Sequence, residues 1–317
     1  MYFLSSEESR WLLRCLVPKS REAGVAEELR GWNWPSPPLE PPYDVKIPLY
    51  QVAGKYCPTG RDLFLKRVEN IETKPGKAMV AGSSYHGAVT QMFTEAKRLI
   101  YLYGVAGAGN IEHHLREFRP RFQVPEHLAD NLTQEDLCSI DEGISKIRDF
   151  QLPRLIARIG EVVSKQPFIE SDALASISVP VVCEYKLDGT FLGLSGFLSC
   201  DAAFTGGPVI FDLKFGRKQD FHRLGATGYA LVMESLFEFP VDTGCIVYVD
   251  MRGDVPSISR ELFFISDELR QWFIDERDEK LQMLYEESDP GVAQQCPGYC
   301  SYVTYCRGLS KGAQTGT

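Results

Sequence analysis

Three β-rich runs between residues 180 and 215 constrain the fold of this chain more than any other feature. Their sequences are VPVVCEYKL, FLGLSGFLSCDAAF and PVIFDLKF, and the segments DGT and TGG between them are typical of hairpin turns. Helical patterns at 83–103 and 134–163 precede the runs. A helix at 219–237, a strand GCIVYVD and a helix at 267–286 are expected to follow. This order predicts an α/β fold in which helices flank a mixed central β-sheet.

The region before residue 50 predicts a different structure. Ser5 and Glu8 have capping-box spacing ahead of an amphipathic helix at 5–16, and a second short helix is expected at 21–29. The segment WPSPPLEPPYDVKIP is dense in proline, which excludes a helix and predicts an extended arm. We therefore expect a helical extension and arm at 1–50, a core domain at 51–290 with a helical insertion at about 105–178, and a cysteine-rich segment at 291–317.

The composition limits the cellular setting and the class of function. The start of the chain has no basic segment followed by an apolar one, and no apolar run is long enough to span a membrane. We therefore predict a cytoplasmic protein whose nine cysteines are mostly reduced, which favours metal or cluster chemistry over disulfides. The net charge of −9 argues mildly against a basic duplex-binding surface, although a nuclease needs carboxylates for its metals.

The strand sequence VIFDLKFG carries a candidate metal-binding carboxylate. Asp212 and Lys214 face the same side of the strand, because side chains alternate between its two faces. An isolated D-x-K is more often a solvated strand face or a simple ion pair. Asp201 in the preceding strand changes this balance, since the hairpin can bring it close to Asp212. Two carboxylates forced together repel unless a proton or cation separates them, so Mg²⁺ or Mn²⁺ is the expected occupant.

A histidine upstream is a further candidate ligand. His86 lies in GSSYHGAVTQMFTEAK, in the first turns of an expected helix. A lone helical histidine is usually a surface or core residue, but an imidazole beside two carboxylates would favour manganese.

The tail sequence CPGYCSYVTYC places Cys296, Cys300 and Cys306 close together. Structural zinc sites usually pair two short knuckles, and this chain has no second one. Iron–sulfur clusters accept a distant fourth thiolate, so they fit this spacing better, and zinc is the alternative. Cys57 is the best partner, because YCPTGRDLFLKRV places it at an expected Cys-Pro helix entry.

Together these elements resemble the RecB-like branch of the PD-(D/E)-x-K nuclease superfamily. Gly82 to His86 matches the first motif of that branch, Asp201 the second, and Asp212 with Lys214 the third. The helix RLGATGYALVMES is similar to the fourth motif, with Tyr229 in the position of its tyrosine. The glutamine of that motif is absent, since Gly225 and Ala226 stand at the two usual spacings.

With the cysteines included, the chain resembles the iron–sulfur RecB-like exonucleases of CRISPR adaptation, the fourth Cas family, in its subtype I-A variant. The resemblance implies a RecB-like restriction-endonuclease fold with an iron–sulfur-binding region. It implies a [4Fe–4S] cluster bound by Cys57, Cys296, Cys300 and Cys306. It also implies Mn²⁺ or Mg²⁺ bound by His86, Asp201, Asp212 and the Leu213 carbonyl group.

The function implied by this likeness is exonucleolytic trimming of DNA ends before spacer capture. The expected partners are DNA and the integrase and other proteins of the adaptation complex, and a homo-oligomer is left open. Lys214 would orient the attacking water or stabilise developing charge, and Tyr229 would position the strand. Arg223, in the basic run KFGRKQDFHR, would contact phosphate. The alternative is a non-catalytic, cluster-bearing structural subunit, which the missing glutamine and the negative charge favour.

Overall fold

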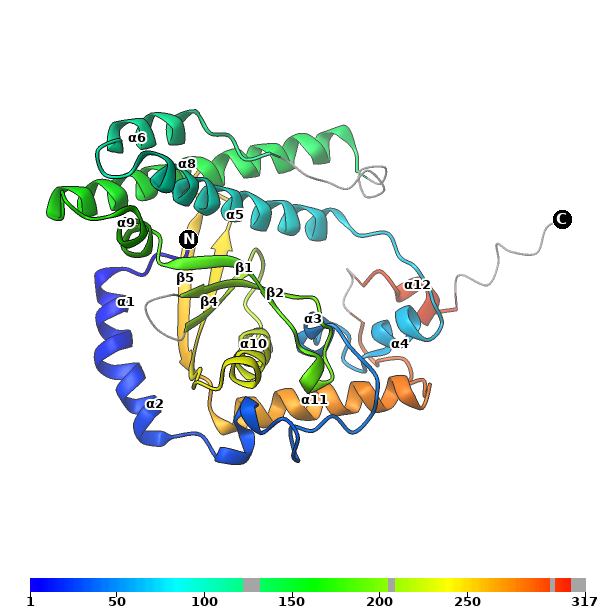
Figure 1. Cartoon of the computed structure of the whole chain (residues 1–317). Helices are drawn as coiled ribbons and strands as arrows, with labels where there is room; N and C mark the ends of the chain where they lie inside the picture. The colour runs from blue at the N-terminus through cyan, green and yellow to red at the C-terminus, as the bar shows by residue number, and fades with distance from the viewer. Residues whose placement is uncertain (122–131, 205–208, 297–299, 309–317) are drawn as a thin grey trace.

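The computed structural model describes residues 1–121, 132–204, 209–296 and 300–308, and a mixed β-sheet lies at its centre (Figure 1). In these residues the sheet has the order β1-β2-β3-β4-β5. Its strands are β1 (Val181–Leu187), β2 (Leu198–Phe204), β3 (Val209–Lys214), β4 (Thr243–Asp250) and β5 (Ser257–Phe264). Among the five strands described, β3 and β4 pair in parallel and the other neighbours pair antiparallel, and the helix α10 (His222–Phe237) connects β3 to β4. The predicted α/β class with a mixed sheet is confirmed.

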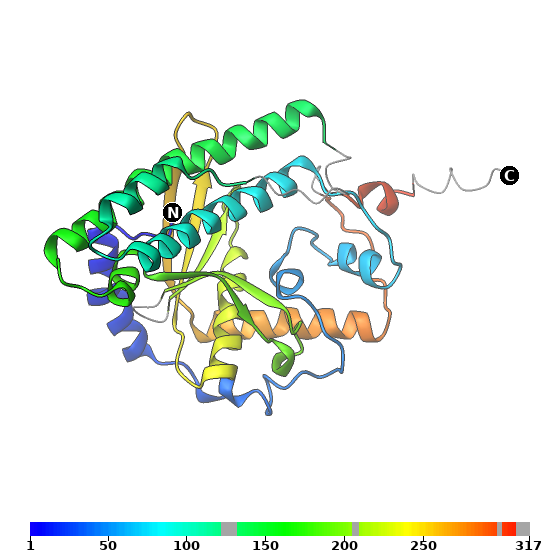
Figure 2. The same cartoon turned by 45° about the horizontal axis from the view of Figure 1, so that its top comes forward.

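Helices cover both faces of this sheet (Figure 2). One face packs against α5 (Lys77–Tyr103) and α8 (Gln134–Lys165), with α6 (Ala108–Glu117) and α9 (Ser171–Ser178) beside them. The other face packs against α10, α3 (Leu49–Ala53) and α11 (Asp267–Tyr285). A hydrophobic core lies on each face of the sheet, and successive side chains of β3 alternate between them. Phe211 and Leu213 face α5, whereas Ile210 faces α10. Asp212 therefore points toward the α10 side.

The two turn predictions around β2 have different outcomes. The connection from β1 to β2 is not the tight hairpin turn expected at DGT, since it runs from Asp188 to Phe197 and contains the 3₁₀ turn η4 (Thr190–Leu192). Burial explains the longer path, because Leu192 and Leu194 pack into the core on the α10 side. The TGG segment lies outside the described residues.

The N-terminal helical part begins as expected. The capping box of Ser5 and Glu8 starts α1 (Ser6–Trp11), and helical backbone continues through η1 (Leu12–Leu16) and α2 (Val17–Ala23). The helix predicted at 21–29 is wrong. Gly24, with φ of 69°, ends α2, and only the short 3₁₀ turn η2 (Glu27–Leu29) follows.

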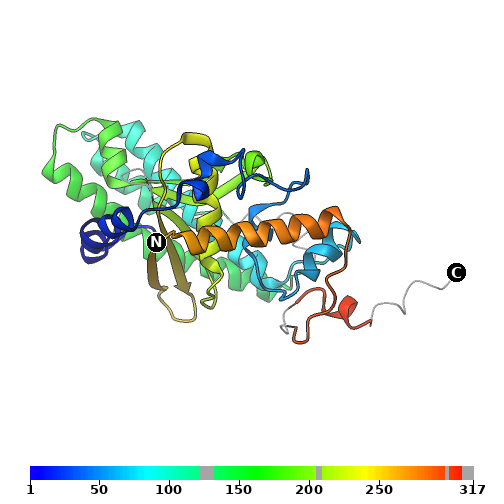
Figure 3. The same ribbon diagram turned by 90° about the horizontal axis from the view of Figure 1, so that it is seen from below.

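The proline-rich arm runs along α10 and α11, as Figure 3 shows from below. It is not extended as expected, because backbone hydrogen bonds such as that from Leu39 N–H to the Ser36 carbonyl, at 3.0 Å, fold its first part into turns. It begins after the 3₁₀ turn η3 (Gly31–Asn33), and it is packed rather than free. Leu39 and Ile47 are fully buried. Arg277 of α11 donates a hydrogen bond of 2.7 Å to the carbonyl of Leu39. The arm is therefore part of the core structure.

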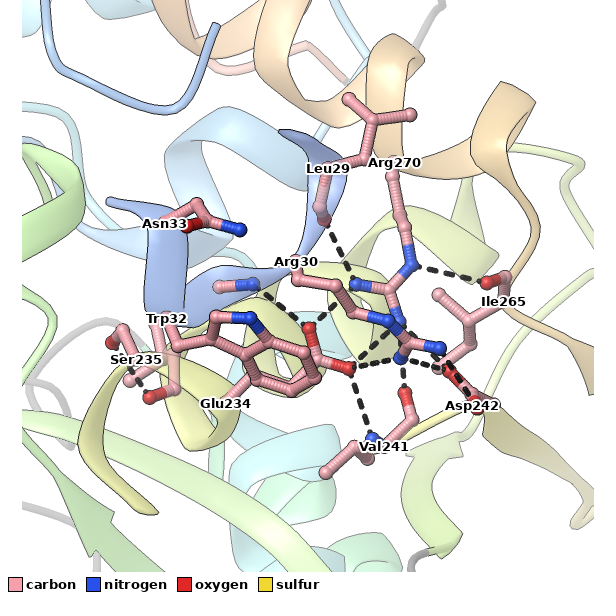
Figure 4. Close-up of polar contacts among 12 residues, drawn as sticks. Leu29, Arg30, Trp32, Asn33, Glu234, Ser235, Val241, Asp242, Ile265 and Arg270 are labelled. Atoms are coloured by element: carbon pink, nitrogen blue, oxygen red, sulfur yellow. Dashed lines mark hydrogen bonds and ion pairs between the residues drawn. The ribbon is translucent and has the colours of Figure 1, made fainter. Parts of the chain in front are cut away.

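A buried network of charges fixes the start of the arm to α10 and α11 (Figure 4). The carboxylate of Glu234 is completely buried and accepts hydrogen bonds from Arg30 at 2.9 Å and from Arg270 at 2.7 and 2.9 Å. Backbone N–H groups of Gly31 and Val241 also donate to it, each at 2.9 Å. Both carboxylate oxygens are thus satisfied, so we assign this network a structural role.

A small satellite core lies beside the main domain. The helices α4 (Arg61–Arg67) and α12 (Val303–Cys306) meet there around Phe64, Leu65 and Tyr302. Arg61 clasps Asp289 with hydrogen bonds of 2.7 to 3.1 Å, which tie α4 to the C-terminal segment. Across the described part of the chain, no helix has the length and apolar character needed to cross a membrane.

Candidate active site

The candidate site lies where β2 and β3 separate. The strands pair at Ala202 and Phe211, and the next residues along would be Asp201 and Asp212. There the Asp201 carboxylate, in place of a backbone carbonyl, accepts the hydrogen bond of the Leu213 N–H at 2.7 Å. The Asp201 and Asp212 carboxyl groups are also close enough to perturb each other's pKa. The structure thus brings the two predicted carboxylates together.

Asp212 is the more perturbed of the two carboxyls. Its residue surface is only 6% exposed, and burial raises its pKa to about 6. Lys214 opposes this effect by an ion pair of 2.8 Å between Nζ and Asp212 Oδ1. Burial works to lower the pKa of Lys214, but the two carboxylates raise it above its ordinary value. The ammonium group of Lys214 is therefore charged at neutral pH. This single positive charge does not fully offset the effect of burial on the two carboxyl groups, whose pKa values stay raised.

His86 reaches the same place from α5. Its Nδ1 lies 3.6 Å from Asp201 Oδ2, and its ring packs edge-on against Phe215. The helix begins at Lys77, so His86 lies in its third turn and not in the first turns as expected. Burial and the charge of Lys214 lower the pKa of His86 to about 4. The imidazole is therefore neutral at ordinary pH, which is the form that binds metals.

These donors suit a hard divalent cation, although the arrangement is not a closed cage. In the part of the chain that the structure covers, no group of three or more His, Cys, Asp and Glu side chains is arranged to hold an ion. One oxygen of each carboxylate is engaged within the protein, Asp212 Oδ1 with Lys214 and Asp201 Oδ2 with the Leu213 N–H. The observation that fits a metal is the proximity of two acids, the buried Asp212 and the half-buried Asp201, with loss of solvent raising the pKa of both.

The fourth motif lies on α10 and reaches the site through Gly225. A Cβ atom at this position would lie 2.8 Å from Asp212 Oδ2, so the helix packs directly on the carboxylate. Tyr229 donates its hydroxyl hydrogen to the Ser199 carbonyl at 2.6 Å. Arg223 binds Glu261 of β5 at 2.7 Å and lies over the ring of Phe263. Tyr229 and Arg223, the two residues predicted to contact DNA, therefore both bind other residues of the protein in this structure.

Sequence reasoning missed a histidine beside this site. His222 is buried, with Nε2 at 3.2 Å from the Tyr56 hydroxyl and Nδ1 at 3.3 Å from the Tyr248 hydroxyl. Burial and then Lys214 lower its pKa to about 4. A signal was present, because His222 precedes Gly225 by three residues and so shares its helix face.

The predicted cluster cysteines lie in the segments around α4 and α12. The thiols of Cys57, Cys300 and Cys306 are half-buried, and Cys57 and Cys306 are near enough to Cys300 to contribute, after burial, to raising its pKa. Cys296 is half-buried as well, and its sulfur lies 3.9 Å from the Ala293 carbonyl. Pro58 does not open a helix as expected. A turn closed by the hydrogen bond from Gly60 N–H to the Cys57 carbonyl comes first, and Gly60, with φ of 71°, caps α4.

Comparison with known proteins gives matches over almost the whole chain. A family model described as CRISPR-associated exonuclease Csa1 matches residues 1–310. The CRISPR-associated exonuclease Csa1 of Saccharolobus solfataricus is 30% identical over 308 residues, which cover 96% of this chain and 99% of that protein. The protein of the same name from Thermoproteus tenax is 30% identical over 301 residues, covering 95% and 98% respectively.

Proposed function

The chain belongs to the Csa1 family of CRISPR-associated exonucleases, and on this basis we propose that it cleaves DNA phosphodiesters in a metal-dependent reaction and trims DNA ends for spacer capture. Membership makes the chain an exonuclease, and this disfavours the alternative of a non-catalytic subunit. The observation that carries the proposal is the convergence of Asp201, Asp212 and Lys214 where β2 and β3 separate. The RecB-like restriction-endonuclease fold belongs to the same proposal.

The residues that would hold the divalent ion are His86, Asp201, Asp212 and the Leu213 carbonyl group. When bound, Mn²⁺ or Mg²⁺ polarises a scissile phosphate and lowers the pKa of an attacking water. Asp212 would share its carboxylate between the ion and Lys214, which pairs with Oδ1. The neutral His86 imidazole needs no proton loss before it can ligate.

Lys214 then acts as the fixed positive charge of the site. Its position next to Asp212 on β3 keeps the ammonium group near the carboxylates. A charged donor held there stabilises negative charge that develops on the phosphate oxygens, and it can orient the attacking water. No other residue described near Asp201 and Asp212 matches this combination of positive charge and position on the strand.

The four cysteines Cys57, Cys296, Cys300 and Cys306 are proposed to bind a [4Fe–4S] cluster. Thiolates are the ligands such clusters require, and the satellite core around Phe64 supplies an apolar shield. The cluster would brace α4 against the C-terminal segment, where Arg61 and Asp289 already join the two. We also propose a division into an extension at 1–50 that packs on the core, a nuclease domain at 51–290 with an insertion at about 105–178, and a closing segment at 291–317.

The test is degradation of end-labelled linear DNA with Mn²⁺ or Mg²⁺ by the unmodified protein and by Asp212→Ala. We expect shortening of linear DNA that Asp212→Ala abolishes, and no attack on a closed circle. Asp44→Ala is the matched control, because the Asp44 side chain is fully exposed and should not matter. Equal inactivity of the unmodified protein and Asp212→Ala would contradict the proposal and favour the structural-subunit alternative. Binding of the integrase proteins would be measured separately, by co-purification.

A further inference from the structure

Tyr56 is an aromatic residue that the catalytic chemistry does not use. It contacts His222, which precedes by three residues the Gly225 that packs on Asp212. It lies between α3 and α4, and its surface is 48% exposed. Its ring meets Phe221 edge-on with centroids 5.0 Å apart. Its hydroxyl lies 3.2 Å from His222 Nε2, and the phenol is close enough to Lys214 to affect its pKa. An exposed ring with an anchored hydroxyl is thus next to the proposed reacting centre.

His222 is built to hold this tyrosine in place. The imidazole is only 5% exposed and spans from Tyr56 to Tyr248 on β4, with one ring nitrogen at each hydroxyl. A neutral imidazole has one donor and one acceptor nitrogen, so it can serve both hydroxyls at once. Because Tyr248 belongs to β4, His222 links the Tyr56 hydroxyl to a residue of the sheet and so restrains the Tyr56 ring.

The backbone around Tyr56 is fixed as well. Lys280 of α11 donates hydrogen bonds to the carbonyls of Val52 at 2.7 Å and Gly54 at 3.4 Å, and Lys55 pairs with Glu276. A ring held from both its backbone and its hydroxyl loses little conformational entropy when it binds a ligand.

We propose that Tyr56 stacks on the DNA strand next to the cleavage site, with His222 as the positioning residue that orients its ring. This inference rests on the proposed function and names the protein's contact to that substrate. Bases stack on exposed aromatic side chains without sequence preference, which suits an enzyme that trims unrelated ends. Tyr229, the tyrosine named by the motif, is less suited because its hydroxyl is committed to the Ser199 carbonyl on β2.

The test separates strand binding from cleavage by using Asp212→Asn as the parent, in buffer that contains a chelator. Binding of a short fluorescein-labelled single strand is followed by anisotropy. Adding Tyr56→Ala should weaken binding by between about 5- and 150-fold, the range for one lost base–aromatic stack. Tyr56→Phe keeps the ring and should lose less. Tyr101→Ala is the matched control, since this tyrosine is 56% exposed on α5, and it should bind like the parent.

The positioning role of His222 has its own readout. His222→Phe keeps an aromatic ring but removes both hydrogen bonds, so it should weaken strand binding when Tyr56 is present. In the Tyr56→Ala background the same change should have no further effect, because there is no ring left to orient. A purely structural role would instead weaken binding equally in both backgrounds, and this would overturn the assignment. Thermal unfolding of each variant checks that the protein is folded.

The outcomes distinguish this inference from the proposed function. If the unmodified protein degrades linear DNA but Tyr56→Ala binds the strand as tightly as its parent, the Tyr56 proposal is wrong and the nuclease proposal stands. If the unmodified protein fails to degrade DNA while Tyr56→Ala still weakens binding, the strand contact stands without the nuclease. Absence of any strand binding by the parent overturns the Tyr56 proposal.

Discussion

Replacing Asp212 by asparagine should make the metal-free protein more stable while abolishing cleavage. The carboxyl group is buried beside Asp201, and burial raises its pKa from 3.8 to about 6. Each tenfold change in an ionisation equilibrium corresponds to about 1.4 kcal/mol, so the ionised group costs the folded state about 3 kcal/mol above pH 6. Asparagine has nearly the same shape and cannot ionise, so it should recover most of this free energy.

The pH dependence gives the sign of the effect. The folded state binds a proton on Asp212 more tightly than the unfolded state, so stability is lost as pH rises from 3.8 through about 6. The gain from Asp212→Asn should therefore be about 3 kcal/mol at pH 8, about half of that at pH 5, and nearly absent below pH 4. Urea unfolding followed by tryptophan fluorescence, with chelator present, measures the free energy of unfolding at each pH.

The matched control is Asp242→Asn. This carboxylate is bound by Arg30 and Arg270 in the buried network, so loss of its charge leaves two guanidinium groups with one partner fewer. We expect it to lower the free energy of unfolding, by about 1–3 kcal/mol. If Asp212→Asn proves less stable than the unmodified protein at pH 8, or if its gain does not shrink with falling pH, the argument from burial is refuted.

Three further predictions concern other parts of the structure. Glu234→Ala leaves Arg270 buried without its main partner and should lower the free energy of unfolding by about 3–5 kcal/mol. A loss below about 1 kcal/mol in urea unfolding would contradict this. Gly225→Ala places a Cβ against the Asp212 carboxylate and should reduce the cleavage rate. Gly160→Ala, with open space around it, should leave the rate unchanged, and equal rates for the two variants would count against the site geometry. Cys57→Ser should remove the brown colour and the absorbance near 400 nm expected of a bound cluster, while Cys183→Ser, which changes a thiol on β1, should retain both. A colourless unmodified protein containing zinc would instead support the zinc alternative.

Local patterns predicted the elements whose signals lie within a few residues. Ser5 and Glu8 cap α1 because their side chains and N–H groups are neighbours in the chain, and the D-x-K strand positions Lys214 beside Asp212 by simple alternation. β5 was missed, since Arg260 and Glu261 interrupt its apolar pattern. These residues are stabilised by Glu8 on one side and by Arg223 and Lys218 on the other, which no local pattern can indicate.

Side-chain periodicity and hairpin proximity are local properties, so the α/β class, the long helices and the acidic pair on adjacent strands were predictable from the chain alone. The folded arrangement was needed to show that β2 and β3 separate at Asp201, that Gly225 contacts Asp212 and that His222 links Tyr56 to Tyr248. Each of these contacts depends on how α10 and the 52–57 segment pack against the sheet. That packing follows from burial of distant apolar surfaces, so it has no signature in any short stretch of the chain.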